Sequence, residues 1–242
     1  MVQRQMVSAV AGLMLLSTPA SALTQAVRAA FEPLRVTAST PSEFIPLGWT
    51  VEEQISGDLN GDGKADIALK LVQERRVTGS AVPTARQRTL LILLGGMTHQ
   101  WCRAALATKL LQCTTCGGAL YGTQEAPAQV TIVNRVLIVK QDHGSRNVIG
   151  QTFRFRYDGK LEKFLLIGVD LTDRDRAAGA LIEESTNFLT GQKLVTKAQF
   201  DERRQKYLTR SSRRSRVRAQ RIAIEDVDYE HYDVGSDDNG GR

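Results

Sequence analysis

Hydrophobic and polar residues alternate along much of the chain after residue 44, which is the pattern of β-strands with one buried face. Residues 152–157 (TFRFRY) show it most clearly, because their aromatic side chains would share one face and their two arginines the other. Two runs, 67–72 and 89–94, are instead almost continuously apolar. We expect these two runs to form central strands that are covered on both faces.

Turn signals separate these strand patterns. Asn134-Arg135, Asp158-Gly159 and Thr190-Gly191 each lie between strand-like runs, as two-residue hairpin turns do. About eight strands result, most of them linked by hairpins. We therefore expect a mainly β fold, built as a single antiparallel meander sheet, a sandwich or an open barrel.

The two ends of this β-rich region have a different composition. Residues 24–35 favour a short N-terminal helix, and residues 197–208 (KAQFDERRQKYL) favour a possible C-terminal helix. Beyond the second helix we expect residues 209–218 to be mobile and residues 222–224 to add at most a last edge strand. Residues 226–242 have the composition of a disordered acidic end.

The first 22 residues have the layout of a secretory signal peptide. A weak positive start at Arg4 precedes an apolar run, 6–16, and a small-residue end, 17–22. The run is too short to span a bilayer, no later run approaches the necessary length, and the first cysteine is Cys102, which argues against a lipid anchor. We expect a periplasmic or secreted protein without a membrane span.

These patterns divide the chain into three parts. Residues 1–22 would be the signal peptide, residues 23–200 an exported β-rich domain, and residues 201–242 a basic segment followed by the acidic, disordered end. A single domain of this length is ordinary for a β architecture.

The net charge of +6 is unevenly distributed. Residues 197–221 hold ten Lys or Arg against two acidic residues, and residues 225–242 hold seven acidic residues against one Arg. Clustered arginines bind polyanions through their phosphate or sulfate groups. An exported protein would meet polyanions of the cell envelope, and not genomic nucleic acid; alternatively, the acidic end folds back and neutralises the basic segment. The candidate polyanion-binding residues are Arg203, Arg204, Arg210, Arg213, Arg214, Arg216 and Arg218.

The chain has three cysteines, Cys102, Cys113 and Cys116. In an oxidising compartment we expect two of them to form a structural disulfide. The sequence leaves the pairing open between the C-x-x-C pair and a bond from Cys102 to one of that pair. Redox chemistry or zinc binding by the C-x-x-C is less favoured, because no second C-x-x-C completes a zinc set.

Residues 57–69 (GDLNGDGKADIAL) hold the sharpest motif. The oxygens of Asp58, Asn60, Asp62, the backbone carbonyl of Lys64, and Asp66 have the spacing of calcium ligands in EF-type loops, and Gly63 would make the tight turn. Leu69 stands where an EF-hand has Glu, and the flanking patterns are strands. We expect a structural Ca²⁺ ion here; the alternative is an Asn/Asp/Gly turn satisfied by its own backbone amides.

The same motif resembles the D-x-N-x-D-G-x-x-D loops of FG-GAP/VCBS repeats and of dockerins, which repeat the loop, whereas this chain has it once. The region 44–196 also resembles a group of small, exported, uncharacterised bacterial proteins. The shared features are the loop itself, IPLGW at 45–49, Gly117-Gly118, residues 152–157 with 166–170, and STNFLTG at 185–191. The resemblance implies one β-rich domain and brings no catalytic residue.

Catalytic signals are weak. Asp142, His143 and Ser145 occur in one short stretch, but neighbouring residues rarely converge, and neither a G-x-S-x-G nor an H-E-x-x-H motif is present. Two long polar segments, 73–87 and 113–128, are the expected binding loops. We therefore expect a calcium-stabilised, non-enzymatic binding or scaffold module at the cell envelope. The alternatives are an immunity or inhibitor protein that binds a partner protein and, less favoured, a hydrolase.

Overall fold

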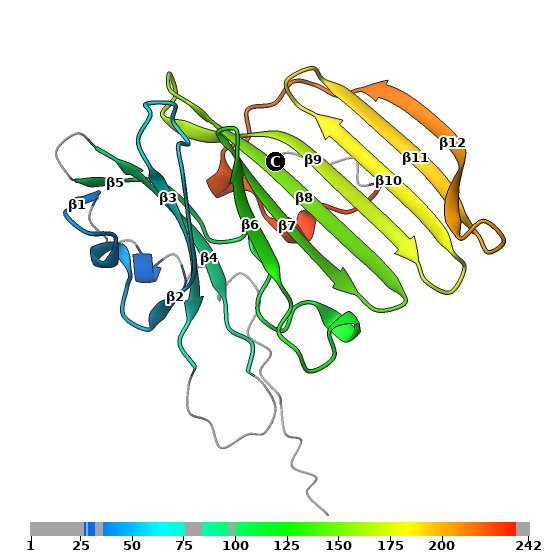
Figure 1. Ribbon diagram of the computed structural model, residues 1–242, viewed down its shortest axis with the longest axis horizontal. Coiled ribbons are helices and arrows are strands. Elements are labelled where there is room, and N and C mark those ends of the chain that lie inside the picture. Colours follow the sequence, from blue (N-terminus) through cyan, green and yellow to red (C-terminus); the bar gives the residue numbers. More distant parts are fainter. Residues whose placement is uncertain (1–26, 28, 32–35, 76–83, 97–99, 236–242) are drawn as a thin grey trace, which may run out of the picture.

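The computed structural model describes residues 27, 29–31, 36–75, 84–96 and 100–235. It is mainly β and consists of two antiparallel sheets that share one hydrophobic core (Figure 1). The expected mainly β class is confirmed, and of the three architectures left open, the sandwich is the one formed. Of the expected N-terminal helix, residues 24–35, the described residues 27 and 29–31 are helical, and the others lie outside the described part.

The first sheet has five strands in the order β1-β5-β4-β3-β2. Its elements, with one short 3₁₀ helix between the first two strands, are β1 (Thr37–Ala38), η1 (Pro41–Phe44), β2 (Trp49–Gly57), β3 (Asp66–Gln73), β4 (Arg88–Gly95) and β5 (Trp101–Ala107). The two apolar runs form β3 and β4, which are buried along most of their length, as expected. They are covered on both faces because Phe31, Phe44 and Trp49 pack on the side away from the second sheet.

The second sheet has seven strands, and each one pairs with the next in sequence, from β6 to β12. The strands are β6 (Ala128–Val133), β7 (Val136–Gly144), β8 (Asn147–Asp158), β9 (Lys163–Asp175), β10 (Ala180–Asn187), β11 (Gln192–Asp201) and β12 (Lys206–Arg216). The short 3₁₀ helices η2 (Gly118–Leu120), η3 (Ile224–Asp226) and η4 (Tyr229–His231) lie outside the sheets. The predicted alternation in β8 is confirmed, because Phe153 and Phe155 are fully buried.

The hairpins of the second sheet use two kinds of turn. Asn134 and Arg135 both take positive φ angles, 51° and 64°, which is the expected two-residue turn between β6 and β7. Two other predicted two-residue turns are four-residue loops, 159–162 and 188–191. Their strands end in a residue whose side chain accepts backbone N–H groups of the loop. Four successive strands, β8 to β11, end in this way. The residues whose side chains accept an N–H of the following loop are Asp158, Asp175, Asn187 and Asp201.

The basic segment differs from the prediction. Residues 197–208 are not a C-terminal helix, and residues 209–216 are not a mobile stretch; they form the hairpin of β11 and β12. Pairing with β11 fixes an extended conformation on residues with good helix-forming composition, because tertiary contacts outweigh intrinsic preference. The seven-stranded sheet therefore continues past residue 200 through β12.

The acidic segment also differs from the prediction. Its described part, as far as residue 235, is ordered against the inner face of β7–β10, and Ile224, Val227 and Tyr232 are buried there. Gln151 Nε2 donates to the backbone oxygens of Tyr229 and Tyr232, both at 2.8 Å. Residues 222–224 add an isolated bridge to Leu165 and not a full edge strand. Apolar residues spaced among the acidic ones supply the buried contacts that a disordered end would lack.

Candidate functional site

The predicted calcium loop connects β2 to β3 and is held by its own side chains. Asp58 accepts the N–H groups of Gly61 at 2.6 Å and Gly63 at 3.2 Å. Asn60 accepts from the Asp62 amide at 2.9 Å, and Asp62 accepts from the Lys64 amide at 2.8 Å, a bond that lowers the pKa of the Asp62 carboxyl. These are the Asn/Asp turns that the sequence left open as an alternative.

Asp66, the last predicted ligand, is fully buried at the start of β3. Its two oxygens accept three backbone N–H groups, from Leu59 at 2.8 Å, Asn60 at 3.2 Å and Gly95 at 3.0 Å. Burial raises the pKa of this carboxyl, and the three amides oppose that effect. Asp66 therefore binds the loop backbone at Leu59 and Asn60 and also links the loop to Gly95 at the end of β4.

The donor set of the loop has the chemistry that Ca²⁺ prefers: three carboxylates, one amide oxygen and one carbonyl. Each carboxylate oxygen has two lone pairs, so one amide bond orients it without using its full acceptor capacity. In the described part of the chain, however, no three His, Cys, Asp or Glu side chains are gathered closely enough to hold a metal ion. A cation lies nearby within the protein itself, because Arg135 Nε is 3.7 Å from Asp58 Oδ2.

The predicted polyanion-binding arginines are distributed over both faces and both ends of β12. Arg203 and Arg204 lie in the turn before the strand, and Arg218 follows it. Arg213 and Arg214 point to opposite faces, because successive strand residues alternate. Within the described residues, none of the seven arginines forms an ion pair with an acidic side chain. The acidic segment makes a different contact, since Asp228 pairs with Lys109 at 3.1 Å.

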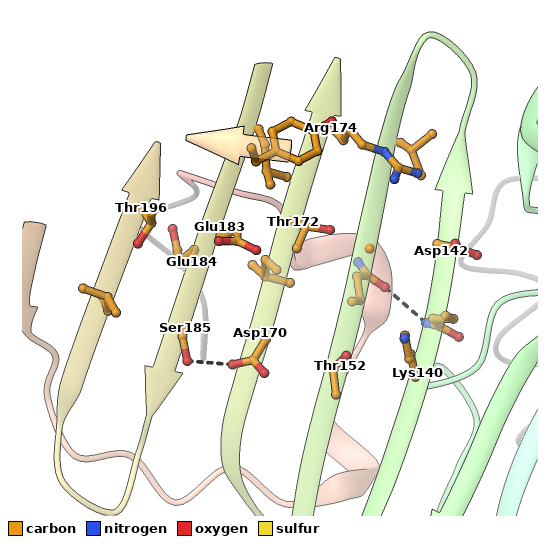
Figure 2. Close-up of a pocket in the computed structure, with 18 residues that line it drawn as sticks. Lys140, Asp142, Thr152, Asp170, Thr172, Arg174, Glu183, Glu184, Ser185 and Thr196 are labelled. Atoms are coloured by element: carbon orange, nitrogen blue, oxygen red, sulfur yellow. Dashed lines mark hydrogen bonds between the residues drawn. The ribbon is translucent and has the colours of Figure 1, made fainter. Parts of the chain in front are cut away.

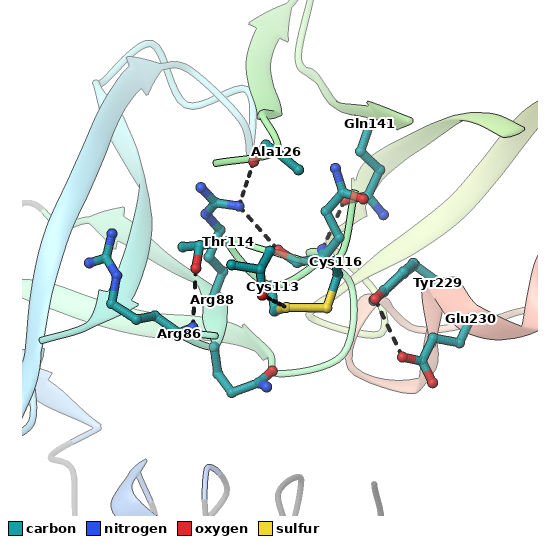
Figure 3. The surroundings of a disulfide bond; sticks show 12 residues. Arg86, Arg88, Cys113, Thr114, Cys116, Ala126, Gln141, Tyr229 and Glu230 are labelled. Atoms are coloured by element: carbon teal, nitrogen blue, oxygen red, sulfur yellow. Dashed lines mark hydrogen bonds between the residues drawn. A yellow bond between two sulfur atoms is a disulfide. The ribbon is translucent and has the colours of Figure 1, made fainter. Parts of the chain in front are cut away.

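The cysteines resolve the open pairing. Cys113 and Cys116 form the disulfide, with their Cα atoms 5.0 Å apart, and Cys102 is a free, exposed thiol on β5. Figure 3 shows the disulfide beside a set of bonds that fix the same loop to the sandwich: Thr114 bonds to the backbone of Arg86, and Arg88 Nη1 donates to the Ala126 oxygen at 2.8 Å. The disulfide closes one turn of an already anchored loop.

The two segments expected to be binding loops are tied to each other. Glu125 of the second loop accepts two bonds from Arg86 Nη2, at 2.8 and 2.9 Å, and one from Arg75 at 2.8 Å. Both arginines belong to the first loop, of which residues 76–83 lie outside the described part. These contacts join Arg75 and Arg86 of the first loop to Glu125 of the second.

The suggested hydrolase residues do not form a catalytic arrangement. Asp142 and His143 are neighbours on β7 and therefore point to opposite faces of the sheet. Asp142 accepts a hydrogen bond from the Tyr121 hydroxyl, while the His143 ring packs against Tyr229 with its centroid 6.4 Å from that ring. Burial, followed by this contact with Asp142, raises the pKa of Tyr121 to about 12.

A hollow on the outer face of the seven-stranded sheet was not predicted from the sequence. It has a volume of about 620 Å³ and is lined by residues of all strands from β7 to β12. We call it the trough. Figure 2 shows the residues that line it, with the C-terminal segment on the far side of the sheet. Glu183 and Ser185 point away from that segment, whereas Glu184 between them points toward it and accepts the Gly235 N–H.

Two cross-strand rows form the floor of the trough, and both follow from the strand register. The first row, from β7 to β11, is Lys140, Thr152, Asp170, Ser185 and Leu194. The second row, two residues further along each strand, is Asp142, Gly150, Thr172, Glu183 and Thr196. The alternation of buried and exposed residues in each strand could have predicted that these residues lie on an outer face. Which of them lie side by side depends on the register between the strands.

About half of the polar side chains that line the trough have hydrogen-bond or ion-pair partners in the protein. Asp170 bonds to Ser185 Oγ and to Arg154 Nη2, both at 2.6 Å, and Asp142 is held by Tyr121. Among the described residues, the side chains of six others make no hydrogen bond or ion pair: Lys140, Thr152, Thr172, Arg174, Glu183 and Thr196. The trough therefore presents free donors and acceptors from five adjacent strands.

Comparison with known proteins gives no relative: no protein-family model, curated protein or solved structure matches the chain. Of the helical residues that the structure describes, none belongs to a helix with the length and apolar character needed to cross a bilayer. The trough is the arrangement of side chains on which a functional proposal can be based.

Proposed function

We propose that this chain is an exported, non-enzymatic binding module and that its binding surface is the trough. The observation that carries the proposal is the set of six polar side chains without protein partners in one hollow. Polar side chains that converge in a hollow of several hundred cubic ångströms are typical of ligand sites. Export is supported by the signal-peptide pattern of residues 1–22.

The construction of the sheet supports a binding role for this face. The row on the opposite side of the same strands includes Gln141, Gln151 and Glu184, which are buried. Gln151 and Glu184 in this row form hydrogen bonds with the C-terminal segment. One face of the sheet is thus fixed by the core, and strands of a packed sheet hold their side chains more rigidly than loops do. A rigid face with free polar groups binds a ligand at a low entropic cost.

Calcium has a structural part in this proposal. The loop 58–66 joins two core strands and lies at the turn between β6 and β7 through the contact of Asp58 with Arg135. A bound Ca²⁺ ion would add its charge to the carboxylates of Asp58, Asp62 and Asp66 and reduce their mutual repulsion. The ion would stabilise the sandwich and would take no part in ligand binding.

A second candidate function is polyanion binding along β12. The observation in its favour is that the seven arginines have no acidic partners within the described residues. Binding of this kind weakens steeply as the salt concentration rises, because it depends on the release of counterions. Salt dependence therefore separates the two candidates.

The proposal is tested by retention of envelope components. The chain is immobilised, incubated with an envelope extract, and eluted with a salt gradient. The trough variant Arg174→Ala/Glu183→Ala removes one base and one acid from the trough. The matched control Glu202→Ala/Lys206→Ala removes one of each from the β11–β12 hairpin. We expect the trough variant alone to lose the retained component. If both variants retain the same components as the natural chain, the trough is not the binding surface.

A further inference from the structure

The hydroxyl groups of the trough indicate which ligands it can bind. Thr152, Thr172, Ser185 and Thr196 come from four adjacent strands, and three of their hydroxyls have no partner within the described residues. A hydroxyl both donates and accepts hydrogen bonds. The surface complements a ligand that carries many groups of the same dual character.

The charges of the trough are balanced. Arg154 neutralises Asp170 and Lys193 neutralises Glu184, both at 2.6 Å. The remaining charges of the lining are Lys140 and Arg174 opposite Asp142 and Glu183. Two positive and two negative charges give no net field that would attract a polyanion or a polycation. The neutral balance distinguishes the trough from the arginines of β12, which carry charge of one sign.

The trough is elongated and partly apolar. Its lining crosses the sheet from β7 to β12, which corresponds to about 24 Å at the usual spacing of strands. Leu181, Leu194 and the ring of Tyr207 add apolar surface among the polar groups. An extended ligand with alternating polar and C–H surfaces would use both, because aromatic rings pack against apolar faces while polar groups bond beside them.

Gly150 keeps the centre of the floor open. A Cβ atom at this position would lie 2.6 Å from Oγ1 of Thr172, its neighbour across the strand pair. A larger residue would displace the Thr172 hydroxyl or cover it. The glycine thus leaves this hydroxyl available at the middle of the second row.

We propose that the trough binds a neutral oligosaccharide chain laid across strands β7–β12. This inference rests on the proposed function and names the ligand class for the same surface. Sugar hydroxyls complement the free Thr hydroxyls, Glu183 accepts from them, and Lys140 and Arg174 donate to them. The sugar C–H faces pack on Tyr207 and the leucines.

The test uses an array of defined oligosaccharides, half of them neutral and half carrying sulfate or carboxylate groups, followed by calorimetry with the best neutral binder. We expect binding to neutral chains with little change between low and high salt. Glu183→Ala/Arg174→Ala should weaken it at least tenfold, and the control Glu202→Ala/Lys206→Ala should leave it unchanged. Thermal melting of both variants shows whether they fold as the natural chain does, and Glu183→Gln, which keeps the side-chain size, should also weaken binding.

Three results would overturn the ligand class: no neutral oligosaccharide binds, only anionic ones bind with strong salt dependence, or the control loses as much affinity as the trough variant. The outcome is separable from the proposed function. If the trough variant still loses its envelope component while no neutral oligosaccharide binds, the surface is right and the ligand class is wrong. If the trough variant keeps its envelope component and no neutral oligosaccharide binds to the natural chain, both proposals fail.

Discussion

Single carboxylate and amide side chains determine where the strands of the second sheet end. Asp158, Asp175 and Asn187 each close the loop that follows their strand by accepting two backbone N–H groups, and Asp201 does so by accepting one, at distances between 2.9 and 3.1 Å. Asp175 does more, because it also forms a bidentate pair with Arg146 across the sheet, at 2.8 and 3.1 Å. The Asp175 side chain therefore fixes both the turn between β7 and β8 and the loop after β9, which lie at the same end of the strands.

This pair predicts an acid dependence of stability. Arg146, followed by the loop amides, lowers the pKa of Asp175 from 3.8 to about 2. A carboxyl whose pKa is lower in the folded chain than in the unfolded chain stabilises the fold at pH values above its unfolded-state pKa. That contribution is lost as the pH falls from about 4 towards 2. We expect Asp175→Asn to lower the urea midpoint at neutral pH and to have little effect near pH 2.

Arg146→Gln provides the companion measurement, because it removes the main cause of the shift and leaves the loop amides in place. It should raise the pKa of Asp175 in an NMR titration and reduce the same pH-dependent stability. A difference between Asp175→Asn and the natural chain that stays constant from neutral pH to pH 2 would contradict this account.

At the scale of elements, the loop between β2 and β3 is held by hydrogen bonds from its own backbone amides to the side-chain oxygens of Asp58, Asn60 and Asp62. Asp66 anchors the loop to β4, and Asp58 reaches the turn between β6 and β7. The loop thus touches both sheets. The sequence predicted a loop between two strands at this place, and the structure has one. The hydrogen bonds among its amides depend on backbone angles that residue spacing does not define, and the calcium site stays a prediction.

Calcium binding by this loop predicts a change in melting temperature. A site of extracellular type with a Kd of roughly 1 mM would stabilise the fold by about 1.4 kcal/mol at roughly 10 mM Ca²⁺. Such a gain raises the melting temperature by about 3–6 °C in a chain of this size. Asp62→Ala should remove the gain, whereas Lys64→Ala should keep it, since Lys64 offers only its backbone carbonyl. Identical melting curves in calcium and in chelator would rule the site out.

The hairpin of β11 and β12 shows why some elements were mispredicted. Asn134-Arg135 gave a recognisable turn because Asn tolerates a left-handed conformation. The turn after Asp201 has no glycine, and Gln205 takes a φ of 51° there. Its sequence, DERRQ, favours a helix locally. Strand pairing with β11 decided the outcome, and that contact cannot be read from the residues themselves.

At the scale of the whole molecule, the C-terminal segment completes the core between the two sheets (Figure 1). Ile224, Val227 and Tyr232 are among its most buried residues, and the Tyr232 ring packs edge-on against Phe153 with centroids 5.1 Å apart. The acidic composition of this segment concealed an apolar pattern that only packing makes visible. The trough likewise required the register of six strands, because Lys140 and Thr196 are distant in sequence.

The packing of this segment predicts a large effect of a single substitution. Tyr232→Ala should lower the free energy of unfolding by about 3–5 kcal/mol, since it removes a buried aromatic ring and leaves a cavity. His231→Ala is the matched control, because the neighbouring His231 side chain is 76% exposed. Urea denaturation measures both variants. Equal losses in the two, or no loss in Tyr232→Ala, would show that the segment does not contribute to the core.

The pairing of consecutive strands in the second sheet has a consequence for the order of folding. All six pairings, from β6 with β7 to β11 with β12, join neighbours in sequence, and such local contacts form quickly. Docking of the C-terminal segment closes a much longer stretch, since the bond from Gln151 to Tyr229 spans 78 residues. We expect the hairpins to form first. If pulse-labelling hydrogen exchange showed protection of the η4 amides before those of β8–β10, this order would be contradicted. In the expected order, the face that bears the trough forms before the C-terminal segment packs against the core on its other side.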